Sequence, residues 1–460
     1  MAEDRADLDE EEAAMERLTA ALAAVEAGDA AGIAALLEPL HAADIADLLE
    51  QIDPDERDAL LALWHPADAG EALGDVLSEL SDSIREEVIE ALPEARVAEA
   101  MRELETDDVV DILEDLDEPA QEKILEALDD SDRVAVEQAL SYPEYSAGRL
   151  MQRETVVGPE HWTVGDAIDH MRSADWLPDQ FYHVILTDPR MKPTGYVTLG
   201  RILSSNRDVK LKDIVEDSFR TVVATDPEAD VAYIFNQYHL ISCPVVDESG
   251  RLVGVITIDD AMNVLDEEHQ EDMLRLAGVG DESTVADGPV ETVKQRLPWL
   301  VANLFTASFS AIVISQFQST IAGLVALAAL MPIVASTGGI AGTQSLAVAV
   351  RALATRDLTR ANAGRVVRRE LAAGLLNGLG LAVILGLAGA LIFGDWHLGF
   401  VLAAAMIVNQ IVAALGGVLV PLTLERMGLD PALASGTFVT TLTDVMGYFA
   451  FLGLATLVLL

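Results

Sequence analysis

The chain has 460 residues, of which 51% are hydrophobic, and yet its formal net charge is −48. Length alone suggests roughly three domains. Residues 1–300 hold 71 acidic and 22 basic residues, a net charge of −49, whereas residues 301–460 hold 6 and 7, a net charge of +1. Charged and apolar residues therefore lie on different halves, which predicts a soluble acidic part joined to a membrane part. A nucleic-acid binder is disfavoured, because phosphate binding requires a basic surface.

Two further features limit the possible classes of protein. The single cysteine, Cys243, excludes an internal disulfide framework and a four-cysteine zinc site. The first residues, MAEDRADLDEEEAA, have neither the basic region nor the apolar region of a signal peptide. We therefore expect the first 300 residues to stay in the cytoplasm.

Residues 1–140 alternate Ala, Leu, Asp and Glu with few β-branched runs, which predicts helices throughout. One unit recurs: DIADLLE at 44–50 leads through Asp53-Pro54 into a second amphipathic stretch, and DVVDILE at 108–114 leads through Glu118-Pro119 in the same way, with a weaker copy at 72–92. Because proline interrupts a helix, these prolines mark turns between paired helices. The pattern predicts an all-α, solenoid-like helical-repeat domain.

The polar face of this N-terminal domain carries mostly one sign of charge. Its acids must repel one another strongly at low ionic strength, so the surface needs cations, a basic partner or high salt. The alternative is the solvated acidic surface of a salt-adapted proteome, because only five of the 29 basic residues are Lys.

From about residue 145 the sequence changes to β-branched runs separated by turns, and a helix–strand–strand–helix pattern occurs twice. In the first repeat we expect a helix at 164–171, strands at 183–186 and 195–198, and a helix at 199–204. In the second we expect a helix at 230–237, strands at 243–247 and 252–258, and a helix from 259. Ser249-Gly250 fits the turn of the second hairpin. Residues 141–265 are thus expected to form two α+β repeats.

The run PVVDESGRLVGVITIDD in the second repeat resembles the CBS domain. That resemblance implies a tandem pair that acts as a regulatory sensor, often of adenine nucleotides, without chemistry of its own. Nucleotide contacts in such pairs need an Asp after the last strand, which Asp259 or Asp260 could supply. ATP at the CBS pair is therefore a candidate ligand.

The segment that follows, 266–293, is expected to be a helix that connects the sensor to the first membrane span. Its first two turns hold five carboxylates, those of Asp266, Glu267, Glu268, Glu271 and Asp272. Like charges at this spacing destabilise a helix, whereas Mg²⁺ or Ca²⁺ bridging to another acidic surface would reverse that effect. The alternative is a solvated linker, and the position beside the membrane part favours cation binding.

Residues 294–460 are expected to form an all-α domain with five transmembrane helices, each of about the 20 apolar residues that a span needs. The expected spans are 297–317, 320–354 with a break at Gly338-Gly339, 371–393, 398–424 and 431–459. Six arginines lie between the second and third spans: Arg351, Arg356, Arg360, Arg365, Arg368 and Arg369. The positive-inside rule places that loop in the cytoplasm, and five spans then place Leu460 outside.

Asp444 is the one ionisable residue in the interior of these spans, within TTLTDVMG at 440–447. Intramembrane charges are costly and usually functional. Three hydroxyls and a glycine beside a carboxylate favour a cation site in a pore, and the alternative is an Asp that only bonds a neighbouring helix. A single carboxylate is a weak binding site for a divalent cation. A symmetric dimer that places two copies of Asp444 on its axis would supply a second carboxylate. No motif of a metalloprotease, a serine hydrolase or a nucleotide-phosphate loop is present, so we expect no enzyme.

Together these motifs resemble the MgtE family of magnesium channels over nearly the whole chain, with GGIAGTQSLAVAVRALATRD and TTLTDVMGYF as the membrane signatures. The resemblance implies a homodimer with an N domain (1–140), tandem CBS domains (141–265), a connecting plug helix (266–293) and a five-helix membrane domain (294–460). It implies a cell-membrane protein with the N-terminus and CBS domains in the cytoplasm. It also implies Mg²⁺ uptake down the electrochemical gradient, closed by cytoplasmic Mg²⁺.

By motif, Asp444 would be the selectivity carboxylate, helped by a backbone oxygen near Thr440, and Thr343 would line the narrow cytoplasmic end of the pore. The residues that resemble the Mg²⁺ ligands of the sensor are Asp260, Glu268, Glu271 and Asp272, with Asp107, Asp108 and Asp111 as candidates in the N domain. The chain departs from the family pattern at Ile340, Thr343, Thr437, Asn263 and His239. We expect intact conduction with fewer sensor ligands or a different Mg²⁺ threshold.

Two other functions stay open. Oxygen ligands discriminate weakly among hard cations, so the protein could be a broader pathway for Mn²⁺, Co²⁺ or Ca²⁺. It could also be a CBS-bearing membrane sensor that conducts nothing. Ion uptake into liposomes separates this sensor from the two transporters.

Overall fold

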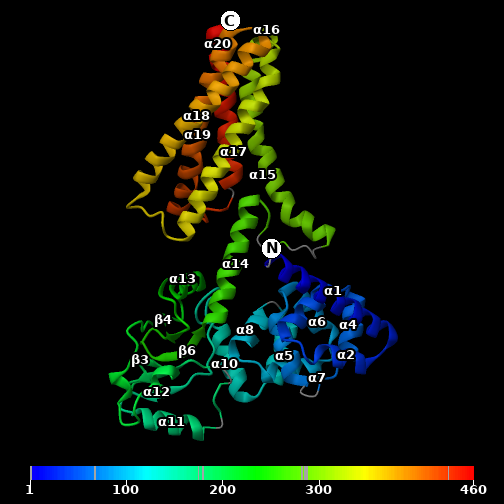
Figure 1. Ribbon diagram of the computed structural model, residues 1–460, viewed down its shortest axis with the longest axis vertical. Helices are drawn as coiled ribbons and strands as arrows, with labels where there is room; N and C mark the ends of the chain where they lie inside the picture. The colour runs from blue at the N-terminus through cyan, green and yellow to red at the C-terminus, as the bar shows by residue number, and fades with distance from the viewer. Residues whose placement is uncertain are drawn as a thin grey trace. The chain divides into compact units, whose positions relative to one another are not determined.

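The structure is a computed structural model that describes residues 3–66, 69–114, 116–174, 176–178, 181–280, 283, 288–433 and 435–459. The chain folds as two compact units, Met1–Asp266 and Glu267–Leu460. In Figure 1 the first unit runs from blue to green and the second from green to red.

In the described part of the first 140 residues, helices are the only regular secondary structure, as predicted. They are α1 (Glu3–Ala27), α2 (Ala30–Leu37), α3 (Ala42–Glu50), α4 (Pro54–Leu63), α5 (Ala69–Glu79), α6 (Asp82–Ala91), α7 (Glu94–Glu103), α8 (Thr106–Glu114), α9 (Glu118–Ala127) and α10 (Asp130–Leu140). Pro54 and Pro119 lie in the first turns of α4 and α9, where a missing N–H costs no hydrogen bond.

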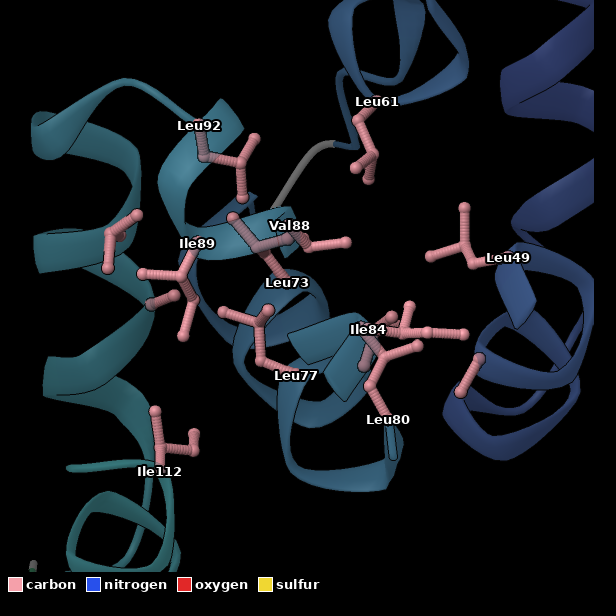
Figure 2. Close-up of a cluster of buried hydrophobic side chains, with 14 of the residues drawn as sticks. Leu49, Leu61, Leu73, Leu77, Leu80, Ile84, Val88, Ile89, Leu92 and Ile112 are labelled. Atoms are coloured by element: carbon pink, nitrogen blue, oxygen red, sulfur yellow. The ribbon is translucent and has the colours of Figure 1, made fainter. Parts of the chain in front are cut away.

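The apolar faces of these helices pack into one core (Figure 2). Leu49 of α3, Leu77 of α5 and Ile112 of α8 are completely buried within it. Each such side chain contributes about 1.5–3 kcal/mol through removal of apolar surface from water. The acids of the same helices are left mostly on the outside, which is how so acidic a sequence folds.

In the described part of residues 141–265, two three-stranded sheets share one topology, in which the first strand is parallel to the second and the third is antiparallel to the second. The strands are β1 (Val157–Pro159), β2 (His183–Thr187) and β3 (Pro193–Thr198), then β4 (Val222–Val223), β5 (Ser242–Val246) and β6 (Leu252–Thr257). The other elements are α11 (Val164–Ser173), α12 (Leu199–Ser204), η1 (Leu211–Asp213) and α13 (Glu228–Tyr238). The tandem α+β repeat is confirmed, and Gly250, at φ +78°, lies in the predicted turn.

The predicted connecting helix has different bounds in the structure. Helix α14 runs from Ile258 to Ala277, and Gly278 follows it with a φ of +73°. Glycine adopts this left-handed conformation readily, and it ends many helices. The next helix begins only at Pro289. The prediction of one helix over 266–293 was therefore wrong, although residues 281–282 and 284–287 lie outside the described part.

The described residues of the second unit include five helices long and apolar enough to cross a membrane, as predicted. These are α15 (Pro289–Gln316), α17 (Ala326–Ala354), α18 (Ala363–Phe393), α19 (Trp396–Arg426) and α20 (Ser435–Leu459), with the short α16 (Gln318–Gly323) between the first two. Helix α19 contacts α17, α18 and α20, and it is the most buried of these five helices. The predicted outer position of Leu460 concerns a residue outside the described ranges.

The second span differs from its prediction at two places. It begins at Ala326 instead of near residue 320, because α16 is a separate helix. It also continues unbroken through Gly338 and Gly339, both of which are buried. Neither glycine has a positive φ. A Cβ at Gly338 would lie 2.1 Å from Asn409 Nδ2, so this glycine is needed for close approach, whereas a Cβ at Gly339 would make only ordinary contacts at 3.8 Å and beyond.

Candidate cation sites

An open groove of about 470 Å³ lies between α17 and α20 in the membrane unit. Its lining residues are Pro332, Ala335, Ser336, Gly339, Ile340 and Thr343 from α17, and Thr440, Asp444 and Tyr448 from α20. The predicted pore residues Asp444, Thr440 and Thr343 thus come together. Ser336 and Tyr448 were missed because each is an ordinary residue within an apolar run. Thr437 is not among the residues that line the groove.

The two threonine hydroxyls of this groove donate to backbone carbonyls of their own helices. Thr343 Oγ1 donates to the carbonyl of Ile340 at 2.9 Å, and Thr440 Oγ1 donates to that of Gly436 at 2.8 Å. A hydroxyl that donates in this way keeps its oxygen lone pairs as acceptors for a cation. The Thr440 carbonyl itself accepts a hydrogen bond from Thr443 Oγ1 at 2.8 Å. The groove therefore offers oxygen ligands only, with Asp444 as its one carboxylate.

A second polar cluster lies where the C-terminal part of α14 meets the membrane helices. Arg275 donates to Asp430 Oδ2 at 2.8 Å and pairs with Glu271 Oε2 at the same distance. Partial burial and then Glu271 and Asp272 raise the pKa of Glu268. Burial and then Asp430 raise the pKa of Asp272. The three predicted carboxylates of the plug helix thus form one group with Asp430, which sequence reasoning missed.

The same end of α14 touches the helices that form the groove. Leu276 packs with Leu346 and Val350 of α17 and with Val439 of α20. The backbone oxygen of Leu276 also lies 3.2 Å from where a side chain on Gly436 would begin. The carboxylate cluster of α14 is thus next to the first turn of the helix that carries Asp444.

A third cluster of acids forms within the first unit. Asp107, at the start of α8, is only 7% exposed, and its pKa is raised by burial and then by Asp260, Asp108, Glu105 and Glu154. Burial is also the first cause at Glu105 and Asp108, whose pKa values are raised to about 7, and at Asp260, whose pKa is raised to about 6. The structure thus brings the predicted Asp107 and Asp108 close to Asp260.

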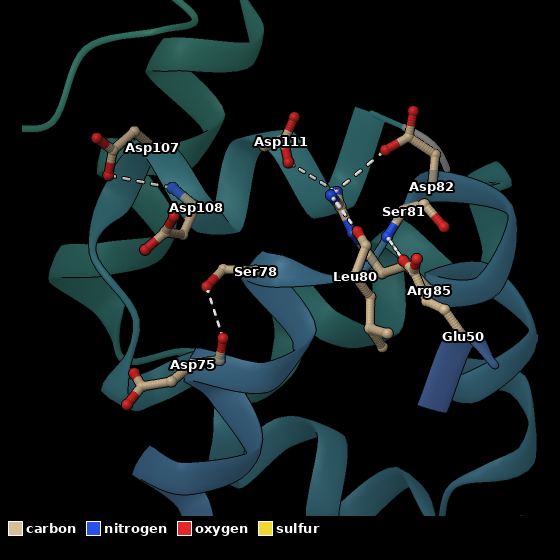
Figure 3. Close-up of polar contacts among 10 residues, drawn as sticks. All are labelled: Glu50, Asp75, Ser78, Leu80, Ser81, Asp82, Arg85, Asp107, Asp108 and Asp111. Carbon is tan, nitrogen blue, oxygen red and sulfur yellow. Dashed lines mark hydrogen bonds and ion pairs between the residues drawn. The ribbon is translucent and has the colours of Figure 1, made fainter. Parts of the chain in front are cut away.

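Asp111, the third predicted acid of the N domain, has a different partner. Its Oδ2 lies 2.7 Å from Nη1 of the buried Arg85, which also pairs with Asp82 (Figure 3). Asp111 is also close enough to Asp108 and Asp260 to be among the charges that raise the pKa of each. The cluster further includes two acids that no sequence pattern singles out, Glu105 and Glu154. Gln152 donates to Glu105, and Thr106 Oγ1 donates to Glu154 at 2.7 Å.

Within the ranges that the structure describes, no three His, Cys, Asp or Glu side chains converge on a point that could hold a metal ion. Within each acidic cluster, the carboxylates therefore lie near one another without forming a closed coordination shell. Two residues within 141–265 depart from the family pattern, His239 and Asn263. His239 ends α13 in a left-handed conformation, and Asn263 is exposed on α14. Neither side chain lies in a described cluster.

A cavity between the two α+β repeats is small. It measures about 20 Å³, and its lining includes His183 and Ser242, whose side chains are hydrogen-bonded to each other at 2.6 Å. Burial lowers the pKa of His183 to about 4, so this histidine is neutral at physiological pH. A nucleotide does not fit this cavity unless the side chains around it move apart.

The raised pKa values predict that the first unit is more stable at pH 5 than at pH 8 without divalent ions. A folded carboxyl with a raised pKa binds more protons than the unfolded chain between about pH 4 and pH 7, so stability falls as pH rises through that window. Thermal unfolding of the protein in detergent measures this. Asp107→Asn with Asp108→Asn should flatten the dependence, and an equal slope in that variant contradicts the assignment.

Three parts of the chain match family models. Residues 40–145 match the MgtE intracellular N domain, residues 211–267 match the CBS domain, and residues 331–454 match the MgtE divalent cation transporter. The chain is 32% identical to the magnesium transporter MgtE of Thermus thermophilus over 443 residues, 95% of this chain and 97% of that one. It is 33% identical to the magnesium transporter MgtE of Enterococcus faecalis over 326 residues, 70% and 71% of the two chains.

A solved structure also resembles the chain, the cytosolic domain of the Mg²⁺ channel MgtE in complex with ATP. It is 28% identical, covers 54% of this chain and 99% of that one, and superimposes with a TM-score of 0.50. The family models, the two relatives and this fold agree with the order of helical domain, CBS pair and five apolar helices. The chain belongs to the MgtE family of divalent cation transporters.

Proposed function

We propose that this protein carries Mg²⁺ across the cell membrane through the groove between α17 and α20, with Asp444 as the ligand that selects the ion. The observation that carries the proposal is that Asp444, Thr440 and Thr343 line one groove in the membrane unit. Both relatives are named magnesium transporters. Carboxylate and hydroxyl oxygens are the ligands that Mg²⁺ prefers.

The groove is open, so one chain supplies only part of an ion's surroundings. A homodimer that pairs two grooves would place two Asp444 carboxylates around one ion. Mg²⁺ sheds water reluctantly, and two carboxylates can bind its hydration shell without removing it. We therefore propose a dimeric pore that conducts a mostly hydrated ion.

The acidic clusters are the proposed sensor that closes this pore. At low cytoplasmic Mg²⁺ the carboxylates of Asp107, Asp108 and Asp260 repel one another, as do those of α14 near Asp430. Bound Mg²⁺ would neutralise both groups and stabilise α14 against the inner ends of α17 and α20. This assignment requires the N and CBS domains to be cytoplasmic, which the six arginines in the adjoining ends of α17 and α18 and in the loop between them support.

Two further properties belong to the same proposal. ATP is a candidate ligand of the CBS pair, because the cytosolic domain of a similar channel was solved with ATP. Binding would have to open the 20 Å³ cavity beside His183. A catalytic role has no support, since the groove holds a single carboxylate and no nucleophile paired with a base.

The test is Mg²⁺ uptake into liposomes that contain the purified protein, with Mn²⁺, Co²⁺ and Ca²⁺ as competitors. A Mg²⁺ channel gives uptake that these ions inhibit weakly. Equal uptake of all four ions would instead make the protein a broader divalent transporter. No uptake of any ion, from a folded protein, would make it a sensor that conducts nothing.

The gating part predicts protection from proteolysis that depends on Mg²⁺. Limited digestion of the full protein should cut the acidic unit more slowly as Mg²⁺ rises, because bound ions favour the compact state. Na⁺ at the same ionic strength should protect much less. Equal protection by both salts would mean that the acids serve only salt tolerance and solubility.

A further inference from the structure

Asn409 is a polar side chain in the middle of the most buried membrane helix, α19. It is 0% exposed, and its Nδ2 donates to the carbonyl of Val334 on α17 at 2.8 Å. Its Oδ1 is buried, and no hydrogen-bond donor reaches it from any residue that the structure describes. An unsatisfied acceptor at this depth costs free energy, so the amide needs a compensating role.

Two glycines make the space for this amide. A Cβ at Gly338 of α17 would lie 2.1 Å from Asn409 Nδ2, and a Cβ at Gly447 of α20 would lie 2.9 Å from the same atom. Carbon atoms do not approach nitrogen so closely, so any side chain at Gly338 would displace the amide. Asn409 is therefore held between α17 and α20 and touches both.

These contacts lie directly behind the wall of the groove. Gly339, the next residue after Gly338, lines the groove, and so do Asp444 and Tyr448 on either side of Gly447. Successive residues of a helix point about 100° apart, so one face of each helix meets Asn409 and the adjacent face meets the groove. Both helices touch the Asn409 amide at this level, so the amide fixes the distance between α17 and α20 there.

We propose that Asn409 is a positioning residue for the pore: it fixes α17 against α20 and so sets where Asp444 stands opposite the α17 side of the groove. The inference rests on the proposed transport of Mg²⁺. Leucine has a similar volume and leaves no unsatisfied acceptor. Asn409→Leu therefore removes the hydrogen bond to Val334 and leaves the volume of the side chain nearly unchanged.

The neighbouring Gln410 offers a matched control. It is 2% exposed, and its Nε2 donates to the carbonyl of Thr337 on α17 at a longer distance, 3.3 Å. It also lies close to Gly374 and Gly378 of α18. Replacing it with Leu removes a buried amide from the same helix without touching the contact that α17 and α20 share at Asn409.

The experiment compares Asn409→Leu, Gln410→Leu and the wild-type protein in liposomes, with Mg²⁺ flux and the ratio of Mg²⁺ to K⁺ flux as readouts. Asn409→Leu should lower Mg²⁺ flux on the order of tenfold or more and lower the Mg²⁺/K⁺ ratio, with thermal stability unchanged or higher. Gln410→Leu should change the ratio little. A wild-type ratio and flux in folded Asn409→Leu overturns the inference alone, whereas no flux from the wild-type protein overturns the proposed function with it.

A second pair of variants tests the contact if Asn409→Leu does not fold. Gly447→Ala places a methyl group against the amide and should reduce Mg²⁺ flux. Gly453→Ala is the control on the same helix, because a Cβ at Gly453 has no atom within 4 Å and should leave the flux unchanged. Wild-type flux and a wild-type Mg²⁺/K⁺ ratio in folded Gly447→Ala would mean that the amide does not set the spacing and that the inference is wrong.

Discussion

Asp444→Ala should abolish Mg²⁺ uptake into liposomes while leaving the protein folded. Asp444 is the one carboxylate in the groove, and no described residue forms an ion pair or hydrogen bond with its side chain. Its removal therefore leaves no partner unsatisfied and should not lower stability. Asp444→Asn keeps the shape and should lose most of the preference for dications over monovalent ions, because a neutral amide attracts them weakly.

The matched control for this variant is Asp395→Asn. Asp395 is a partly exposed acid of the membrane unit that lies outside the groove and caps α19 by accepting from the His397 N–H at 2.9 Å. Asn caps a helix about as well as Asp, so Asp395→Asn should leave both the helix and the uptake nearly unchanged. Wild-type uptake in folded Asp444→Ala would mean that the ion does not pass this carboxylate.

The second large effect is expected at the end of α14. Neutralising Glu268, Glu271 and Asp272 together, as Glu268→Gln, Glu271→Gln and Asp272→Asn, should give Mg²⁺ flux that cytoplasmic Mg²⁺ no longer shuts off. When an ion binds only the closed state, each tenfold rise in Mg²⁺ above saturation of one site adds about 1.4 kcal/mol toward closure. Several sites together make closure steep, and their removal makes it disappear.

The ion pairs of Arg275 allow two effects of these substitutions to be distinguished, the loss of an ion pair and the loss of a Mg²⁺ site. Glu271 pairs with Arg275, which also holds Asp430, so its neutralisation weakens an ion pair as well as a potential Mg²⁺ site. Glu268→Gln with Asp272→Asn leaves that pair intact and should still raise the Mg²⁺ concentration needed for closure. Exposed acids of α9 and its surroundings provide a control of equal charge: Glu122→Gln, Glu126→Gln and Asp129→Asn.

Flux in these variants is measured against Mg²⁺ on the side that faces the soluble unit. The charge-matched control should close at the wild-type concentration, because its acids lie outside both clusters. If the triple variant of α14 also closes at the wild-type Mg²⁺ concentration, the carboxylates of this helix are not the sensor. Closure would then depend on the cluster around Asp107 or on another part of the chain.

Local patterns in the sequence predicted the architecture well where the physical cause is also local. Pro54 and Pro119 mark helix starts because proline has no N–H to leave unbonded. Gly250 marks the hairpin because glycine adopts positive φ. The five spans follow from length and hydropathy. Asp444 could be found because a charge within an apolar run is costly and is usually kept for a function.

The features that were missed depend on residues far apart in the chain. Arg275 meets Asp430 across 155 positions, and Thr106 meets Glu154 across 48, so no spacing rule indicates either contact. Strands β1 and β4 have three and two residues, too few for an alternating pattern to show. Gly338-Gly339 suggested a break because the side chain that uses the space, Asn409, lies on another helix.

The open side of the groove has a genetic consequence. If two chains complete one pore, a cell that makes both wild-type and Asp444→Ala chains assembles mixed dimers as well as pure ones. Each mixed pore has a single carboxylate, so the variant would inactivate its wild-type partners instead of merely diluting them. Uptake in such a cell should follow the square of the wild-type fraction, the mark of a dominant-negative allele, whereas a groove that conducts within one chain would give a straight line.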